Sequence, residues 1–155
     1  MKLTSTPLPG VFTIEDPSFP DERGYFQRLY CRRDLAGQGI DFDPVQSSVS
    51  FNRQQGTLRG MHYQAAPHSE KKLVTCLWGA IWDVALDLRP GSPAFGKWFA
   101  LELKPGSGRS LYIPEGCAHG FLTLEDNSVV GYQISQYYHP AAEGVRWDDS
   151  RFGIA

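Results

Sequence analysis

Two histidines and the cations near them are the residues of this chain that point most directly to chemistry. His62 lies between Arg59 and Lys72 in the sequence, and His119 follows a segment containing glycine and proline. An imidazole titrates near neutral pH, so it can remove or return a proton, and its neutral form is a common metal ligand. The two chemistries to weigh are therefore proton transfer and metal binding. The alternative for each histidine is a hydrogen-bonded residue of the core.

Short strands separated by turns must position these side chains. Strand-like runs recur between breaker residues, because the chain contains 16 Gly and 11 Pro. We expect strands over residues 24–30, 44–52, 57–63, 72–77, 80–88, 97–103, 109–113, 120–123 and 128–138, and one short helical turn over 33–39. Many short strands with regular turns predict an all-β sandwich or barrel.

The segment 80–88 has two different faces. One face is apolar and consists of Trp82, Val84, Leu86 and Leu88. The other mixes carboxylates with small apolar groups and consists of Ile81, Asp83, Ala85 and Asp87. Because side chains alternate along a strand, we expect the first face in the core and the second lining a wet cavity, with a plain solvent face as the alternative.

Composition restricts the class of protein. The chain has 155 residues, and its 15 Lys+Arg and 17 Asp+Glu give a net charge of −2, which provides no electrostatic case for nucleic acid binding. No apolar run approaches the roughly 20 residues of a transmembrane helix, and no signal peptide is visible. Cys31, Cys76 and Cys117 are odd in number and far apart, which argues against a disulfide framework and favours the reducing cytoplasm. We expect one cytoplasmic domain over residues 1–155 that binds neither nucleic acid nor membrane.

Two segments have the spacing of a known barrel superfamily. Residues 56–64 resemble the first cupin motif, with His62 in place and Gln64 where a second histidine belongs. Residues 108–123 resemble the second cupin motif, with His119 in place. The two motifs in this order imply a cupin double-stranded β-helix, also called a jelly roll.

The same motifs bear on metal binding. Cupin metal sites use three histidines and a glutamate as ligands. This chain offers His62, His119 and Glu70, while Gln64 is a poor ligand. We therefore expect a metal-free barrel that uses no cofactor.

Further matches extend over most of the chain and specify a family. They occupy residues 21–26, 56–64, 72–74, 82–89, 92–96, 112–121 and 147–149. In this order they resemble dTDP-4-dehydrorhamnose 3,5-epimerase and its sugar-nucleotide relatives. The resemblance implies a homodimeric isomerase that inverts C3 and/or C5 of a dTDP-4-keto-6-deoxy sugar through an enolate, in dTDP-rhamnose or related deoxysugar biosynthesis.

This reaction requires a base on one face of the sugar and an acid on the other. His62 suits the base, because an imidazole has an ordinary pKa of about 6.5. The resemblance assigns Tyr132 as the acid and Lys72, with His119 beside it, as the group that stabilises the enolate oxygen. The alternatives are an ordinary strand aromatic for Tyr132 and a solvated neighbour of Lys71 for Lys72.

The nucleotide half of such a substrate requires cations for the diphosphate. Arg59 and Arg23 fit, because a guanidinium binds two phosphate oxygens at once, although each could instead form a surface salt bridge. The resemblance implies that Arg23 reaches the site of the neighbouring subunit. The other positions that it implies for substrate binding are Gln46, Ser48 and Glu143.

Several positions depart from the family pattern. Arg28 stands where the family has glutamate, and Ser48 stands where it has asparagine, so the base or sugar recognised is in question. The chain also stops at residues 152–155, without the family's C-terminal tail, which carries an aspartate that pairs with the catalytic histidine. We therefore hypothesise that Asp83 supplies this carboxylate to His62.

Three other functions stay open at this point. A 3- or 5-monoepimerase acting on a different nucleotide sugar would exchange hydrogen at one carbon only. A non-catalytic sugar-nucleotide-binding cupin would exchange none. A metal-dependent cupin dioxygenase or isomerase would contain stoichiometric metal.

Overall fold

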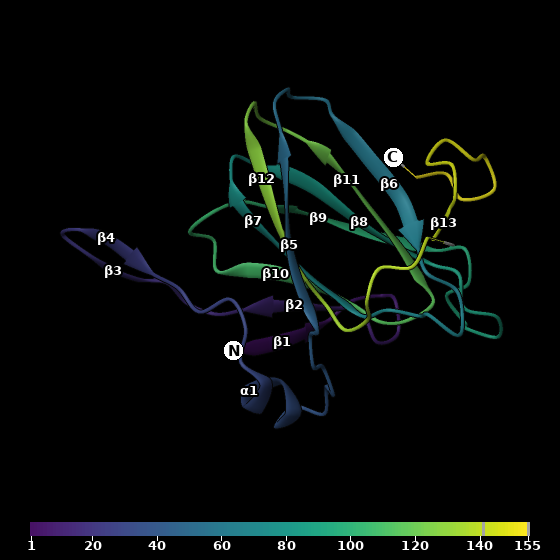
Figure 1. Ribbon diagram of the computed structural model, residues 1–155, viewed down its shortest axis with the longest axis horizontal. Coiled ribbons are helices and arrows are strands. Elements are labelled where there is room, and N and C mark those ends of the chain that lie inside the picture. Colours follow the sequence, from purple (N-terminus) through teal and green to yellow (C-terminus); the bar gives the residue numbers. More distant parts are fainter. Residues whose placement is uncertain (141, 155) are drawn as a thin grey trace.

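Two antiparallel sheets face each other in the computed structural model, which describes residues 1–140 and 142–154 (Figure 1). The first sheet contains β1 (Lys2–Ser5), β2 (Phe12–Glu15), β5 (Gln46–Asn52), β7 (Lys72–Trp78), β10 (Arg109–Ile113) and β12 (Ser128–Ile134). The second contains β6 (Leu58–Tyr63), β8 (Ile81–Asp87), β9 (Trp98–Leu103), β11 (Cys117–Thr123) and β13 (Glu143–Gly144). Their strand orders are β1-β2-β10-β7-β12-β5 and β13-β6-β11-β8-β9, so most neighbours are distant in sequence. The predicted all-β jelly roll is confirmed.

A hairpin and one short helix complete the fold. Strands β3 (Phe19–Asp21) and β4 (Gly24–Phe26) pair only with each other, and their hairpin projects away from the two sheets (Figure 1). Helix α1 (Arg32–Ala36) lies where the sequence predicts a helical turn, and Gly37 caps its C-terminal end. In the part of the chain that the structure describes, no helix is long and apolar enough to cross a membrane.

The core lies between the two sheets. Val74 and Val130 come from the first sheet, and Ile81 and Phe121 come from the second. All four side chains are buried. Complete burial of an apolar side chain of this size stabilises a fold by about 1.5–3 kcal/mol, so this layer is the main force that holds the sheets together.

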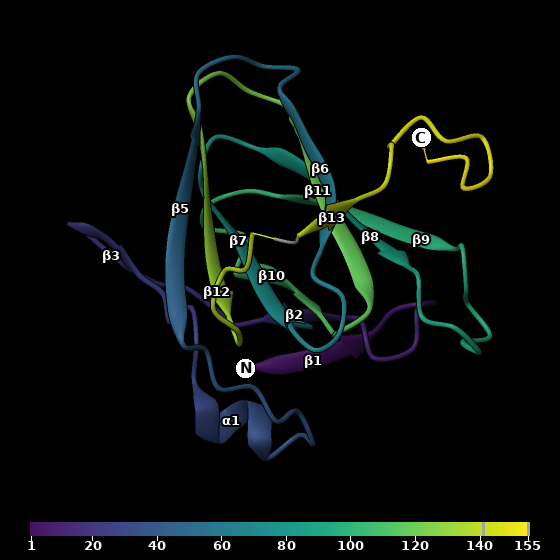
Figure 2. The same cartoon turned by 45° about the vertical axis from the view of Figure 1, so that its right-hand side comes forward.

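Strand β8 corrects one expectation. Ile81 and Ala85 belong to the core between the sheets, and both aspartates of the mixed face are fully buried, so this face does not line a wet cavity. The apolar face, including Val84 and Leu86, packs on the outer side of the second sheet against the C-terminal segment (Figure 2). The alternation along one strand does not reveal that both of its faces are covered.

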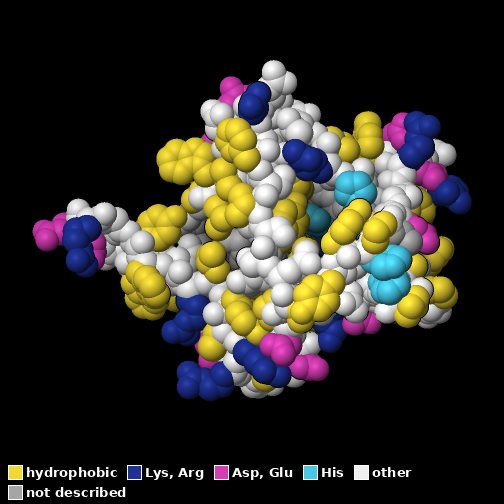
Figure 3. Space-filling view, in the orientation of Figure 1, with side chains coloured by type: hydrophobic (Ala, Val, Ile, Leu, Met, Phe, Trp, Pro, Cys, Tyr) yellow, Lys and Arg dark blue, Asp and Glu magenta, His cyan; other side chains and the backbone are white. Residues whose placement is uncertain are grey.

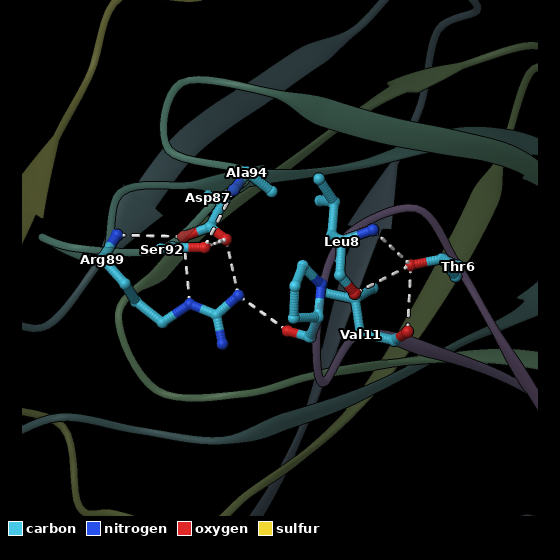
Figure 4. Close-up of polar contacts among 8 residues, drawn as sticks. Thr6, Leu8, Val11, Asp87, Arg89, Ser92 and Ala94 are labelled. Atoms are coloured by element: carbon cyan, nitrogen blue, oxygen red, sulfur yellow. Dashed lines mark hydrogen bonds and ion pairs between the residues drawn. The ribbon is translucent and has the colours of Figure 1, made fainter.

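Asp87, at the end of β8, has a structural role. Its carboxylate accepts hydrogen bonds from Arg89 Nη2 at 2.6 Å and from Ser92 Oγ at 2.7 Å, and Arg89 Nη2 also donates to the Pro9 carbonyl (Figure 4). Burial alone would raise the pKa of Asp87, but these hydrogen bonds hold it below its ordinary value. The network ties the N-terminal loop to the second sheet.

Several strand boundaries differ from the expected ones. β4 ends at Phe26 because only β3 pairs with it, and β12 ends at Ile134, opposite the first residue of β5. β11 begins at Cys117, so His119 lies within a strand rather than before it. The sequence does not predict β1, β2, β3 or β13, because they are short and depend on partners far away in the chain.

Candidate active site

A cavity of about 740 Å³ opens between the sheets, where β5, β7 and β12 face β6 and β11. Histidine side chains lie in and beside a hollow on this face of the molecule (Figure 3). Most of the predicted site residues line the cavity, namely Gln46, Ser48, Arg59, His62, Lys72, His119 and Tyr132. Residues far apart in sequence therefore share one open cavity.

Two histidines stand side by side on adjacent strands of the second sheet. His62 on β6 and His119 on β11 are direct cross-strand partners. Close contact of the two backbones depends on Gly60, whose φ of +127° favours glycine and whose added Cβ would lie 2.5 Å from the Gly120 Cα. The glycines of the two motifs thus bring the two imidazoles together.

Asp83 pairs with His119 and not with His62. Its Oδ1 lies 2.7 Å from His119 Nε2, and its side chain is 0% exposed. Among the described residues, no carboxylate oxygen lies within 4.0 Å of a His62 ring nitrogen. The hypothesis of an Asp83–His62 pair is therefore wrong. The reason is the strand order. β11 lies between β8 and β6, so Asp83 on β8 contacts His119 on the adjacent strand and not His62 on β6.

The surroundings of His62 favour its neutral form. His62 is exposed to the cavity, but the protein around it partly desolvates the imidazole and lowers its pKa, and the positive charges of Lys72, His119 and Arg59 lower it further. The ordinary value is about 6.5, so the imidazole is neutral at pH 7 and ready to accept a proton.

The pH dependence of kcat/KM tests this environment. If His62 is the base, its protonation removes the proton acceptor, so we expect the acidic limb of the profile below about pH 6.5. Arg59→Gln removes one of the charges that lower the pKa of His62, so the acidic limb of this variant should move to higher pH. Arg53→Gln, an exposed arginine outside the cavity lining, is the matched control and should leave the limb in place. A wild-type limb above pH 6.5, or the same limb in both variants, would contradict this explanation.

Tyr132 faces His119 from the opposite sheet. The two rings form an edge contact, with centroids 5.9 Å apart. Burial raises the pKa of Tyr132, and the Asp83 carboxylate raises it further. The phenol therefore stays protonated at neutral pH and can serve as a proton donor. A neutral imidazole and a protonated phenol thus occupy opposite walls of one cavity.

The cations of the cavity are positioned by polar partners. Lys72 Nζ lies 2.6 Å from Glu70 Oε1, and these side chains are only 12% and 11% exposed. Arg59 Nε donates to Asn52 Oδ1 at 2.7 Å. In the part of the chain that the structure describes, the terminal nitrogens of Arg59 form no hydrogen bond, so they are available to an anion in the cavity.

The donor set does not fit a cupin metal site. The Gln64 oxygen accepts the His139 N–H at 2.7 Å, and its nitrogen donates to backbone carbonyls. Glu70 is engaged by Lys72. Within residues 1–140 and 142–154, no group of three or more His, Cys, Asp or Glu side chains could hold a metal ion.

Three predicted residues do not line this cavity: Asp83, which is buried against His119, and also Arg23 and Glu143. Arg23 is exposed on the β3–β4 hairpin, where its Nη2 lies 2.6 Å from Asp21 Oδ2. Glu143 on β13 accepts a hydrogen bond from the hydroxyl of Tyr63, and it is Tyr63 that lines the cavity. Arg28 also lies outside the lining and pairs with Asp34 at 3.2 Å.

Tyr138 is a cavity residue that the sequence does not single out. It lines the mouth although its side chain is 71% exposed. It is the last residue of the expected strand 128–138, and no pattern in the sequence distinguishes it from its neighbour Tyr137, which does not line the cavity.

Comparison with known proteins identifies the family. The family model for dTDP-4-dehydrorhamnose 3,5-epimerase matches residues 5–155. The dTDP-4-dehydrorhamnose 3,5-epimerase of Sinorhizobium fredii is 39% identical over 155 residues, which cover 99% of this chain and 80% of that protein. The crystal structure of the Bacillus anthracis dTDP-4-dehydrorhamnose 3,5-epimerase with TDP and PPi bound has a TM-score of 0.95 at 36% identity, covering 99% of this chain and 88% of that one.

A second solved structure contains a sugar nucleotide. The dTDP-6-deoxy-D-glucose-3,5-epimerase of Legionella pneumophila, in complex with dTDP-4-keto-L-rhamnose, has a TM-score of 0.93 at 34% identity. The match covers 99% of this chain and 81% of that one. The chain therefore belongs to the dTDP-4-dehydrorhamnose 3,5-epimerase family.

Proposed function

We propose that the protein is an epimerase that inverts C3 and C5 of a dTDP-4-keto-6-deoxy sugar, as in dTDP-rhamnose biosynthesis. The observation that carries this proposal is the pair of His62 and Tyr132. Their environments move the two pKa values in opposite directions, and such pairs mark the base and the acid of a proton-transfer site. The dTDP-4-keto sugar bound to the Legionella relative supports the substrate class.

At each carbon, the proposed reaction removes one proton and returns one proton. His62 removes the C–H proton next to the C4 ketone, and the electron pair of that bond moves onto the C4 oxygen to form an enolate. Lys72 stabilises this oxyanion with its positive charge, and His119 lies beside it. Tyr132 then gives its hydroxyl proton to the carbon from the other face. The site is reset when His62 releases the abstracted proton to solvent and the Tyr132 phenolate takes one from solvent.

Asp83 acts in this scheme through His119. The Asp83 carboxylate, 2.7 Å from Nε2, fixes the orientation of the imidazole. His119 lines the cavity, so the oriented ring lies beside the place proposed for the enolate oxygen. Asp83 is therefore a positioning residue for the enolate site rather than the partner of the base.

The nucleotide half of the substrate is proposed to lie toward Arg59, Gln46 and Ser48. Arg59 binds the diphosphate through its terminal nitrogens, and the β5 side chains contact the sugar or the base. We propose that Arg23 of a second copy completes the anion site, because Arg23 does not line the cavity of its own chain. Exposed aromatic residues on the same hairpin, Phe19, Tyr25 and Phe26, support a homodimer in which this hairpin is covered.

Subunit complementation tests whether Arg23 contributes to the active site of the neighbouring subunit. Arg23→Ala and His62→Asn should each inactivate a homodimer, whereas a mixed dimer has one site with an intact His62 and an intact partner arginine. Random mixing should therefore restore about a quarter of the wild-type sites. In the matched control, His62→Asn mixed with Lys72→Met regains nothing, because both residues lie in the same chain's cavity. No recovery in the first mixture, measured by turnover, would place Arg23 outside the site.

The configuration of the product tests the proposed function. After incubation with dTDP-4-keto-6-deoxyglucose and borohydride reduction of the C4 ketone, the ¹H NMR coupling constants of H3, H4 and H5 should report inversion at both C3 and C5. Unchanged couplings with the wild-type protein would reject the epimerase proposal. Inversion at one carbon would replace it by a monoepimerase.

A cytoplasmic location is part of the proposal. It rests on Cys31, Cys76 and Cys117, which are free thiols and suit a reducing compartment.

A further inference from the structure

Two loops that lack regular secondary structure contribute Gln64, Glu70 and Tyr138 to the lining of the cavity, and a single side chain joins them. We propose that Gln64 is a positioning residue that sets the mouth of the cavity by fixing the backbone around Tyr138. The loops are residues 64–71, between β6 and β7, and the segment that follows β12 from residue 135 to 140. This inference rests on the proposed function and specifies how the site binds its substrate.

The Gln64 carboxamide is fully occupied by backbone groups. Gln64 is 4% exposed, and its nitrogen donates to the carbonyls of His68 at 3.0 Å and Tyr137 at 3.3 Å. Its oxygen accepts the His139 N–H at 2.7 Å. One side chain therefore bridges the two loops, and the stacked rings of His68 and His139, with centroids 3.7 Å apart, support the same junction.

A second glutamine fixes Tyr138, which lies between the Tyr137 and His139 backbone groups bound by Gln64. The oxygen of Gln46, at the start of β5, accepts the Tyr138 N–H at 3.1 Å. Hydrogen bonds to Gln64 and Gln46 thus hold the Tyr137 carbonyl and the N–H groups of Tyr138 and His139. The Tyr138 side chain is 71% exposed, so packing contributes little to its position and the backbone must place the ring at the cavity mouth.

This arrangement requires a carboxamide. Only an amide side chain offers two donors and an acceptor at once. Gln64→Leu leaves the three backbone groups without these partners, and Gln64→Glu sets a carboxylate oxygen against two carbonyl oxygens. In both variants we expect the segment to move and the cavity mouth to widen, while His62 and Tyr132, held on strands, keep their places.

The experiment measures KM, kcat and the Kd of dTDP for both variants. We expect KM and Kd to rise about 10-fold, equivalent to about 1.4 kcal/mol, with kcat within about threefold of wild type. The Kd of Gln64→Glu should improve as the pH falls, because protonation of the carboxyl restores one donor. The matched control is Gln38→Leu, since Gln38 also forms three hydrogen bonds to backbone groups but joins α1 to β1 far from the cavity. It should leave KM and Kd unchanged.

A double-mutant cycle shows whether Gln64 acts through Tyr138. If it does, Gln64→Leu combined with Tyr138→Ala should bind dTDP as weakly as Tyr138→Ala alone. Additive losses would overturn the proposal, because Gln64 would then contact the ligand itself. A fall in kcat with unchanged KM would also overturn it.

Amide hydrogen exchange separates this proposal from the proposed function. The amides of residues 137–139 should exchange faster in Gln64→Leu than in the wild type and in Gln38→Leu, whether or not the protein turns over substrate. Equal exchange would overturn the role of Gln64, whereas an inactive wild type with faster exchange in the variant would reject only the enzyme activity.

Discussion

Replacing His62 by alanine is expected to lower kcat by about 10²–10⁴-fold, the usual contribution of a general base. The imidazole is the group of this cavity whose pKa is lowered by burial and by neighbouring cations, so it is neutral when the substrate binds. The change removes the proton acceptor, and KM should change much less than kcat. Turnover followed by NMR measures both.

Chemical rescue distinguishes loss of the base from loss of the fold. His62→Ala leaves a space beside the cavity, so added imidazole should restore part of the rate, and the thermal midpoint should stay close to that of the wild type. His62 is exposed at the cavity, which limits the stability cost of truncation. A loss of less than about 10-fold would show that another group accepts the proton.

Replacing Tyr132 by phenylalanine is expected to separate hydrogen exchange from inversion. The rate of inversion should fall by about 10²–10⁴-fold, because the phenol is the proposed donor on the second face. His62 still removes the substrate proton and exchanges it with solvent, so in D₂O the recovered substrate should carry deuterium with its original configuration. Mass spectrometry and NMR of the recovered sugar measure the two effects separately.

Tyr112→Phe is the matched control for this change. Burial raises the pKa of Tyr112 to about 12, but its ring packs in a different cluster with Phe42 and Ile14. It should therefore keep wild-type inversion. Inversion at wild-type rates in Tyr132→Phe would remove the phenol from the mechanism.

The sequence predicts the parts of the site that local spacing determines. The motif spacing places His62 in an expected strand and His119 directly before one, and in the structure β11 extends over His119 and pairs it with His62. Lys72 and Tyr132 also belong to predicted strands and line the predicted cavity. Here a local pattern suffices, because each side chain needs only its own strand to point inward.

The partner of each histidine could not be predicted, because it depends on strand order. Asp83 is far from both histidines in sequence, and the arrangement of β6, β11 and β8 decides which of them it reaches. The place of Tyr138 likewise depends on the contacts of Gln64 and Gln46 across the cavity wall. Long-range pairing, rather than local propensity, fixes these features.

The most direct test of the central claim is solvent exchange during turnover. In D₂O, the wild-type protein should convert dTDP-4-keto-6-deoxyglucose to a product that carries deuterium at both C3 and C5, because each inversion replaces the abstracted proton by one from solvent. The His62→Ala protein should incorporate far less in the same time. No deuterium at either carbon above the level of His62→Ala would contradict the proposal that this cavity performs epimerisation through an enolate.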